Sequence, residues 1–215
     1  MKISVPKQEF EVNPEDLTAV EQFLSKIAPG FVKEFGGVLS DSVKGWRARN
    51  MIKILTRTKV LIEQSGLSQQ ELSGKFFVQA IEKASVEDDD TLQEKWAQLL
   101  SSAVSGKVQQ DVKYISILSE LSSIEVKLLD AISKGQVQST PRVPEFIYSA
   151  EKVTEYLKIS SVATKIMIDN FYRLNICHAP AMDGITVGSQ KALVRTNETF
   201  TFTDLGRAFL SAVKG

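Results

Sequence analysis

The sequence predicts a mainly α-helical protein with an N-terminal helical bundle, residues 1–121, and a small winged-helix-like α+β domain, residues 122–215. Apolar residues recur at helical spacing as far as about residue 133. The segment GQVQSTPRVPEF, residues 135–146, then interrupts this periodicity with two prolines and reads as a linker or irregular connection. Alternating apolar and polar residues appear only beyond residue 183, which places all the predicted strands near the end of the chain.

The predicted bundle begins at Asn13 and Pro14, an N-cap residue followed by a proline suited to the first helical position. Pro29 and Gly30 end this first helix. A second helical region covers residues 31–64, and its glycines predict a kink or break near Ser40 and Asp41. The later helices of this part, and the one that opens the C-terminal domain, are predicted over residues 69–85, within 86–104, and over 111–121 and 123–133.

The C-terminal part follows the helix over residues 123–133 with two short helices, strands and a last helix. The helices are expected over residues 149–158 and 160–174, the strands within 183–188 and 191–203, and the last helix from residue 204. Three helices followed by two or three strands is the element order of a winged helix-turn-helix domain.

Composition favours a cytoplasmic, soluble protein without a general attraction to polyanions. The 215 residues include 26 Lys plus Arg and 26 Asp plus Glu, so the formal net charge is zero. The single cysteine allows no internal disulfide, which suits a reducing compartment. The N-terminus lacks the apolar core of a signal peptide, and no apolar run reaches the roughly 18–20 residues that span a bilayer.

An acidic run, residues 87–90, directly precedes the helix that contains Trp96. Four consecutive acids without a glycine do not form a calcium loop of the EF-hand type. Asp90 and Gln93 instead have the spacing of a capping box, with Asp90 at the N-cap, and carboxylates are favoured at the positive end of a helix dipole. We therefore interpret the run as a helix cap rather than a metal site, and expect Trp96 in the core.

The residues needed for catalysis are scarce. His178 directly follows Cys177, and neighbours in an extended segment point to opposite sides, so this pair cannot work as nucleophile and base. Four Cys or His ligands for zinc are absent from the sequence, as is a phosphate-binding loop of the GxxxxGK[ST] type. We expect a protein that is not an enzyme and that carries no cofactor or metal.

A basic stripe on the second helical region is the first candidate contact surface. Arg49, Lys53 and Arg57 lie at i, i+4 and i+8 and so share one helix face. Such a stripe either pairs with carboxylates of the same chain, such as Asp88 and Asp89, or contacts nucleic acid, an anionic lipid surface or an acidic partner. Zero net charge favours internal pairing. The residues of this candidate surface are Lys44, Trp46, Arg47, Arg49, Lys53 and Arg57.

The helix at residues 160–174 occupies the position of a recognition helix and is the second candidate surface. Its apolar stripe, which we expect to face the core, consists of Ala163, Met167, Phe171 and Leu174. Its opposite face consists of Val162, Lys165, Ile166, Asp169, Tyr172 and Arg173. Two aliphatic residues and an aspartate are poorly suited to base edges and phosphates, so this face favours a protein surface over DNA.

Several segments together resemble the Abi-alpha (abortive infection alpha) family of bacterial proteins. SVEDDDTLQEKWAQLLSSAV, preceded by KFFVQAIEKA and followed by YISILSELSSIEVKLLDAI, resembles the core signature of that family. WRARNMIKILTRTKVLIEQSG is similar to the helix that precedes the signature, and TFTDLGRAFLSA to the usual ending. The resemblance implies a role in antiphage defence, in which an infected cell halts growth before phage is released, and it supplies no mechanism.

These inferences together predict a non-enzymatic antiphage protein that acts through contacts with a protein partner or with itself. Two alternatives remain open: a winged-helix DNA-binding regulator, and a peripheral protein that perturbs membranes through the basic amphipathic helix. We favour neither nucleic acid nor a membrane surface as the partner.

Overall fold

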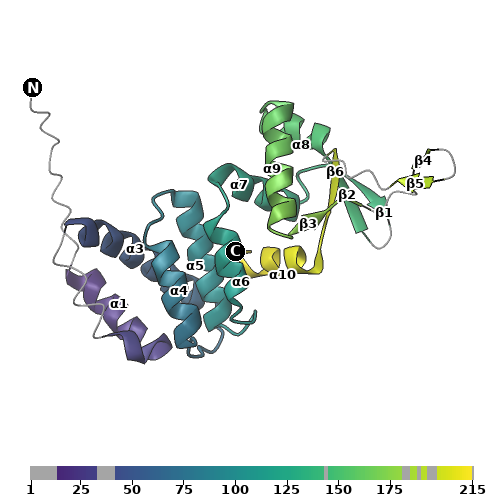
Figure 1. Cartoon of the computed structure of the whole chain (residues 1–215). Coiled ribbons are helices and arrows are strands. Elements are labelled where there is room, and N and C mark those ends of the chain that lie inside the picture. The colour runs from purple at the N-terminus through teal and green to yellow at the C-terminus, as the bar shows by residue number, and fades with distance from the viewer. Residues whose placement is uncertain are drawn as a thin grey trace, which may run out of the picture.

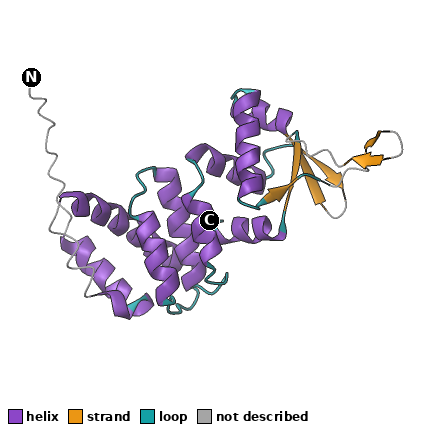
Figure 2. Ribbon diagram, viewed as in Figure 1, coloured by secondary structure: helices purple, strands orange, loops and turns teal. Residues whose placement is uncertain are grey.

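The computed structural model describes residues 14–32, 42–142, 145–180, 185–187, 190–192 and 198–214. The protein is mainly helical, as the sequence predicted, with a small antiparallel sheet. Helices from the first half of the chain gather at one end of the molecule, and the strands at the other (Figures 1 and 2). The predicted break near residues 40–41 lies outside the described residues.

The first half of the chain forms a bundle around a buried central helix. Its elements are α1 (Pro14–Ile27), η1 (Pro29–Phe31), α3 (Ser42–Ser65), α4 (Gly74–Ala84), α5 (Asp90–Val104) and α6 (Val112–Ser119). Helix α5 is buried along nearly its whole length, with α3, α4 and α6 packed against it, while α1 packs on α3. Trp96, 1% exposed, is among the largest fully buried side chains of the described residues, which confirms the core position predicted for it.

The helix predicted over residues 69–85 begins later, at Gly74, because the preceding segment is held in an extended path. The amide of Gln70 donates to the carbonyl of Val104 and that of Leu72 to Ile27, both at 2.8 Å. These bonds hold the segment against the bundle, and the side chain of Leu72 is buried there. Leu72 suggested an earlier helix start, but it packs into the core from a loop. Ser73 then caps α4 by accepting a hydrogen bond from the amide of Phe76.

The second half of the chain combines further helices with a four-stranded sheet. Its helices are α7 (Ser123–Ser133), α8 (Ala150–Leu157), α9 (Ser161–Arg173) and α10 (Asp204–Ala212). Its strands are β1 (Ser139–Arg142), β2 (Glu145–Ser149), β3 (Cys177–His178), β4 (Ile185–Val187), β5 (Gln190–Ala192) and β6 (Thr199–Phe202). Strands β1, β2, β6 and β3 pair antiparallel in that order, while β4 and β5 form a separate hairpin.

The interpretation of residues 135–146 as a linker was wrong, because β1 and the start of β2 lie within them. Pro141 obscured the signal, since proline is excluded from central strands, yet β1 is an edge strand where a missing amide donor is tolerated. The aromatic face of the sheet explains why the hairpin is ordered there. Tyr148 on β2 stacks on Phe200 of β6 at 5.4 Å, and Phe171 of α9 meets Phe200 edge-on at 6.3 Å.

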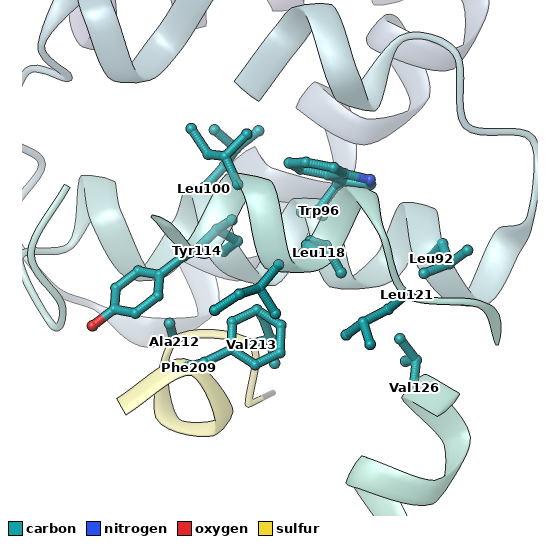
Figure 3. Close-up of a cluster of buried hydrophobic side chains, with 14 of the residues drawn as sticks. Leu92, Trp96, Leu100, Tyr114, Leu118, Leu121, Val126, Phe209, Ala212 and Val213 are labelled. Atoms are coloured by element: carbon teal, nitrogen blue, oxygen red, sulfur yellow. The ribbon is translucent and has the colours of Figure 1, made fainter. Parts of the chain in front are cut away.

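The last helix, α10, leaves the sheet and returns to the bundle (Figure 1). Phe209 lies 6.3 Å from Tyr114 of α6, measured between ring centroids, in a buried cluster that also holds Leu118 and Val213 (Figure 3). The C-terminal helix therefore contributes to the core of the N-terminal bundle as well as to its own sheet. Among the described residues, every helix is too short or too polar to cross a membrane.

Candidate functional site

The acidic run at the start of α5 is a helix cap, but the capping residue is Asp89 rather than Asp90. The Asp89 carboxylate accepts hydrogen bonds from the amides of Thr91 at 2.9 Å and Leu92 at 3.1 Å. The bond from Leu92, first among several, lowers the pKa of Asp89. Gln93 donates to the carbonyl of Glu87 at 2.8 Å, so it does not close the predicted capping box with Asp90.

A metal site is not assembled from the described residues, where no three His, Cys, Asp or Glu side chains converge. Cys177 and His178 lie on opposite sides of β3, Cys177 buried and His178 exposed, as their adjacency predicted. Burial raises the pKa of the Cys177 thiol well above its ordinary value. This arrangement keeps the thiol protonated and away from the imidazole.

A pocket of about 330 Å³ lies where the first turns of α4 and α6 meet. Ser73 and Asp111 in its wall already accept bonds from backbone amides as helix caps. Gln110 bridges the two segments by accepting from the amide of Ser73 at 2.6 Å and donating to the carbonyl of Glu71 at 3.0 Å. These polar groups hold the loops together, and they do not form a nucleophile–base pair.

The basic stripe of α3 faces the start of α5. Lys53 pairs with Asp90 at 2.5 Å, and Arg57 donates to both carboxylate oxygens of Glu94, at 2.7 and 3.0 Å. Arg47 donates through Nε to the Ser85 hydroxyl at 2.9 Å. The structure thus places three of the candidate cations against polar groups of the same chain. The carboxylate partners are Asp90 and Glu94, whereas the sequence analysis named Asp88 and Asp89.

The remaining residues of the stripe extend the same contact. Asn50, which sequence reasoning did not single out, is buried and donates to the carbonyl of Ser85 at 3.1 Å. Trp46 and Arg49 are half-buried, and Lys44 lies in the first turn of α3. Residues advance along α3 and α5 in the same direction, 53 to 57 against 90 to 94, so the two helices run parallel.

Helix α9 presents its predicted apolar stripe to the core. Met167 and Phe171 are buried, while Ala163 and Leu174 are partly buried. Two residues outside the predicted stripe, Thr164 and Ile168, are fully buried as well. Thr164 escaped the prediction because it is polar; its hydroxyl lies 2.8 Å from that of Thr154 on α8, which satisfies it.

The opposite face of α9 combines two exposed aliphatic side chains in its N-terminal half with ion-paired cations. Val162 and Ile166, one turn apart, are 65% and 64% exposed. Lys165 pairs with Glu198, and Arg173 donates to Glu120 at 2.6 Å. The carboxylate partners of these two cations come from distant segments, so no local pattern could have identified them.

Two further residues of the predicted face of α9 differ in their surroundings. Tyr172 is half-buried and donates its hydroxyl to the carbonyl of Thr199 at 2.7 Å, so it belongs to the contact with the sheet rather than to an outer surface. Asp169 is exposed. Asn170, absent from the prediction, donates to the buried carboxylate of Glu125 at 2.7 Å and ties α9 to α7.

A buried cation, Lys95, joins three segments and was not predicted. It is 4% exposed, and its Nζ donates to Asp130 of α7 at 2.5 Å, to Gln98 at 2.8 Å and to the carbonyl of Val213 at 3.0 Å. In the sequence it precedes Trp96 and reads as a solvated lysine. The packing of α7 and α10 against α5 explains its burial.

Comparison with known proteins identifies one family. A family model described as "Abortive infection alpha" matches residues 47–213. No curated protein and no solved structure matches the chain. Because the match covers most of its length, the chain belongs to the abortive infection alpha family.

Proposed function

We propose that this chain is a cytoplasmic, non-enzymatic abortive infection protein that acts through protein contacts made by the N-terminal half of α9. The family description supplies the defence context. The exposure of Val162 and Ile166 on consecutive turns of one helix is the observation that carries the proposal. Exposed aliphatic side chains on one helix face suit an apolar protein surface.

The charges of α9 favour a protein over DNA. Lys165 and Arg173 are the cations that could reach phosphates from this helix, and both are engaged by carboxylates of the same chain. A groove-reading helix needs free donors for phosphates and base edges. The order α7, α8, α9 and the β4–β5 hairpin supports our interpretation of the C-terminal part as winged-helix-like, and we propose that this scaffold serves protein recognition.

The test is a double substitution, Val162→Ser with Ile166→Ser, assayed for protection of bacteria against a panel of phages. The matched control is Leu67→Ser with Val86→Ser, since these side chains are 44% and 49% exposed elsewhere on the surface. We expect the α9 variant to lose protection with an unchanged melting temperature, while the control retains it. Equal protection by both variants would contradict the proposed surface.

Two binding assays separate the alternatives. Retention of the wild type on duplex DNA that falls steeply with salt would support the DNA-binding regulator instead. Flotation with acidic liposomes would support the membrane-perturbing alternative. We expect neither, because Lys53 and Arg57 of α3 and Lys165 and Arg173 of α9 already have carboxylate partners.

A further inference from the structure

The first turn of α10 is fixed to the segment that directly follows α9. The Thr203 hydroxyl accepts from the amide of Gly206 at 2.9 Å and donates to the carbonyl of Asn175 at 2.7 Å. The amide of Thr203 donates to the carbonyl of Ile176 at 3.0 Å. Gly206 lies so close to that carbonyl that an added Cβ would be 1.9 Å from its oxygen. The end of α9, at Arg173, and the start of α10 are therefore held together.

The last turn of α10 is fixed to the bundle. Phe209, Ala212 and Val213 are buried against α5 and α6 (Figure 3). The carbonyl of Val213 accepts from Nζ of Lys95, which is itself buried. A buried ammonium that loses an acceptor is costly, so this bond opposes withdrawal of the last turn.

We propose that α10 is a conformational latch that couples the end of α9 to the helical bundle, with Lys95 as the buried group that holds it closed. A displacement of the end of α9 must carry the first turn of α10 with it, because Thr203 and Gly206 are packed on residues 175–176. That movement pulls Val213 away from Lys95. The latch gives the α9 surface a route to the bundle, a role that rests on the proposed function.

Asp130 makes the latch a junction of three segments. Its carboxylate pairs with Lys95 at 2.5 Å and is itself one-third exposed, so the ion pair spans from the core to the edge of α7. Helix α7 is also tied to α9 through Glu125 and Asn170. The buried ammonium thus contacts both α7, which is bonded to α9, and α10, which is bonded to the segment after α9.

Coupling between two sites is reciprocal, which makes the latch testable from either end without any partner. From the bundle end, we would replace Lys95 by Met in the full-length chain and measure amide hydrogen exchange. Lys53→Met is the matched control, because it removes an exposed lysine from an ion pair with Asp90. Opening should speed exchange in residues 171–176 by about fivefold or more, with no such change in the control.

From the α9 end, Thr203→Val removes the hydroxyl that joins α10 to Asn175, and Thr203→Ser retains it. We expect Thr203→Val to speed exchange at residues 209–213, and Thr203→Ser to behave as the wild type. This pair also keeps the test decisive if Lys95→Met does not fold. Changes confined to each substituted turn, or a uniform rise across the chain, would overturn the latch.

These exchange measurements use the chain alone, so they succeed or fail independently of the proposed function. Loss of phage protection in the Val162 and Ile166 variant tests the α9 surface and leaves the latch untouched. If exchange shows coupling while that variant protects normally, the latch stands and the proposed surface is wrong. The reverse outcome would retain the surface and eliminate the latch.

Discussion

Arg57 and Glu94 face each other across α3 and α5 through two hydrogen bonds, from Nε to Oε2 at 2.7 Å and from Nη2 to Oε1 at 3.0 Å. One turn earlier on both helices, Lys53 pairs with Asp90. The two segments that carry much of the family resemblance are thus in register with each other. Their charges explain why a strongly basic helix occurs in a chain of zero net charge.

Replacing Lys53 and Arg57 together with glutamine should lower the free energy of unfolding modestly, by about 0.5–2 kcal/mol, because exposed ion pairs each contribute up to about 1 kcal/mol. Urea denaturation measures this loss, and Lys107→Gln, at an exposed position beyond α5, is the control. Wild-type binding to DNA or acidic liposomes that vanishes in the double variant, at unchanged stability, would show that the stripe serves an external polyanion.

Asp89→Ala should cost about 1 kcal/mol of stability, the usual effect of losing an N-cap, since the carboxylate accepts from two amides of α5. Asp88→Ala, at the exposed residue just before it, is the matched control and should cost little. Thermal unfolding measures both. Adding Mg²⁺ or Ca²⁺ should leave the melting temperature unchanged, and a rise of several degrees would reveal a metal site in the acidic run.

The same cap predicts a pH dependence. Hydrogen bonds from Leu92 and Thr91 lower the pKa of Asp89 in the folded chain, so its contribution is present above the unfolded pKa of about 4. As pH falls through the lower folded pKa, the carboxylate is protonated and the contribution disappears. The stability difference between wild type and Asp89→Ala should therefore shrink below about pH 4. A difference that stays constant to pH 2 would contradict this cap.

Local signals predicted most of the helices, because apolar periodicity and capping residues act within a few positions. α7 has the bounds that were expected, and α8 and α9 are each shorter than expected by one residue at both ends. The cap of α5 was misplaced by one residue because four consecutive acids offer the same chemistry, and only the backbone geometry selects Asp89. Prediction from local sequence fails where contacts with a distant segment determine the backbone conformation. Leu72 is an example, because its amide bonds to the carbonyl of Ile27 and its segment is a loop instead of a helix.

The candidate surfaces likewise combine features that local sequence predicts with contacts that depend on distant segments. The spacing of Arg49, Lys53 and Arg57 predicted a shared helix face, but the carboxylate partners of Lys53 and Arg57 depend on the register between α3 and α5. Lys95 looks like a surface residue until α10 covers it. Contacts between residues 95 and 213 arise from tertiary folding, and a single sequence contains no local sign of them.

Trp96→Ala should cost about 3–5 kcal/mol, the range for large-to-small changes in a packed core, because the side chain is 1% exposed. Trp96→Phe should cost clearly less. The indole Nε1 is buried and has no hydrogen-bond partner among the described residues, so phenylalanine also removes an unsatisfied donor. Urea denaturation of both variants measures the difference. Equal losses would show that the indole nitrogen makes a bond in solution.

Cys177 should react with a thiol reagent at pH 8 only when the chain opens. Burial raises the pKa of its thiol, so the folded protein holds it as the unreactive protonated form, whereas an unfolded thiol is partly ionised at that pH. Labelling should be slow in buffer and complete in urea. The raised pKa also lowers stability as pH rises above about 8.5, since the unfolded thiol ionises first. Rapid labelling of the folded chain would contradict the buried position.

Gly206→Ala should destabilise the chain by about 1–3 kcal/mol, the usual cost of overpacking. An added Cβ would lie 1.9 Å from the carbonyl oxygen and 2.8 Å from the carbonyl carbon of Ile176, both backbone atoms that cannot rotate aside. The helix must therefore move away from the turn that follows α9. Gly45→Ala, in α3, is the matched control, because an added Cβ there meets nothing within 4 Å.

Alanine is favoured over glycine inside a helix by about 1 kcal/mol, so the control should become more stable while Gly206→Ala becomes less stable. Opposite signs from one chemical change isolate the steric contact with Ile176 from helix propensity. Chemical denaturation of both variants gives the two free energies. If Gly206→Ala were as stable as the wild type, α10 would not be packed on residues 175–176, and its first turn could not hold the end of α9.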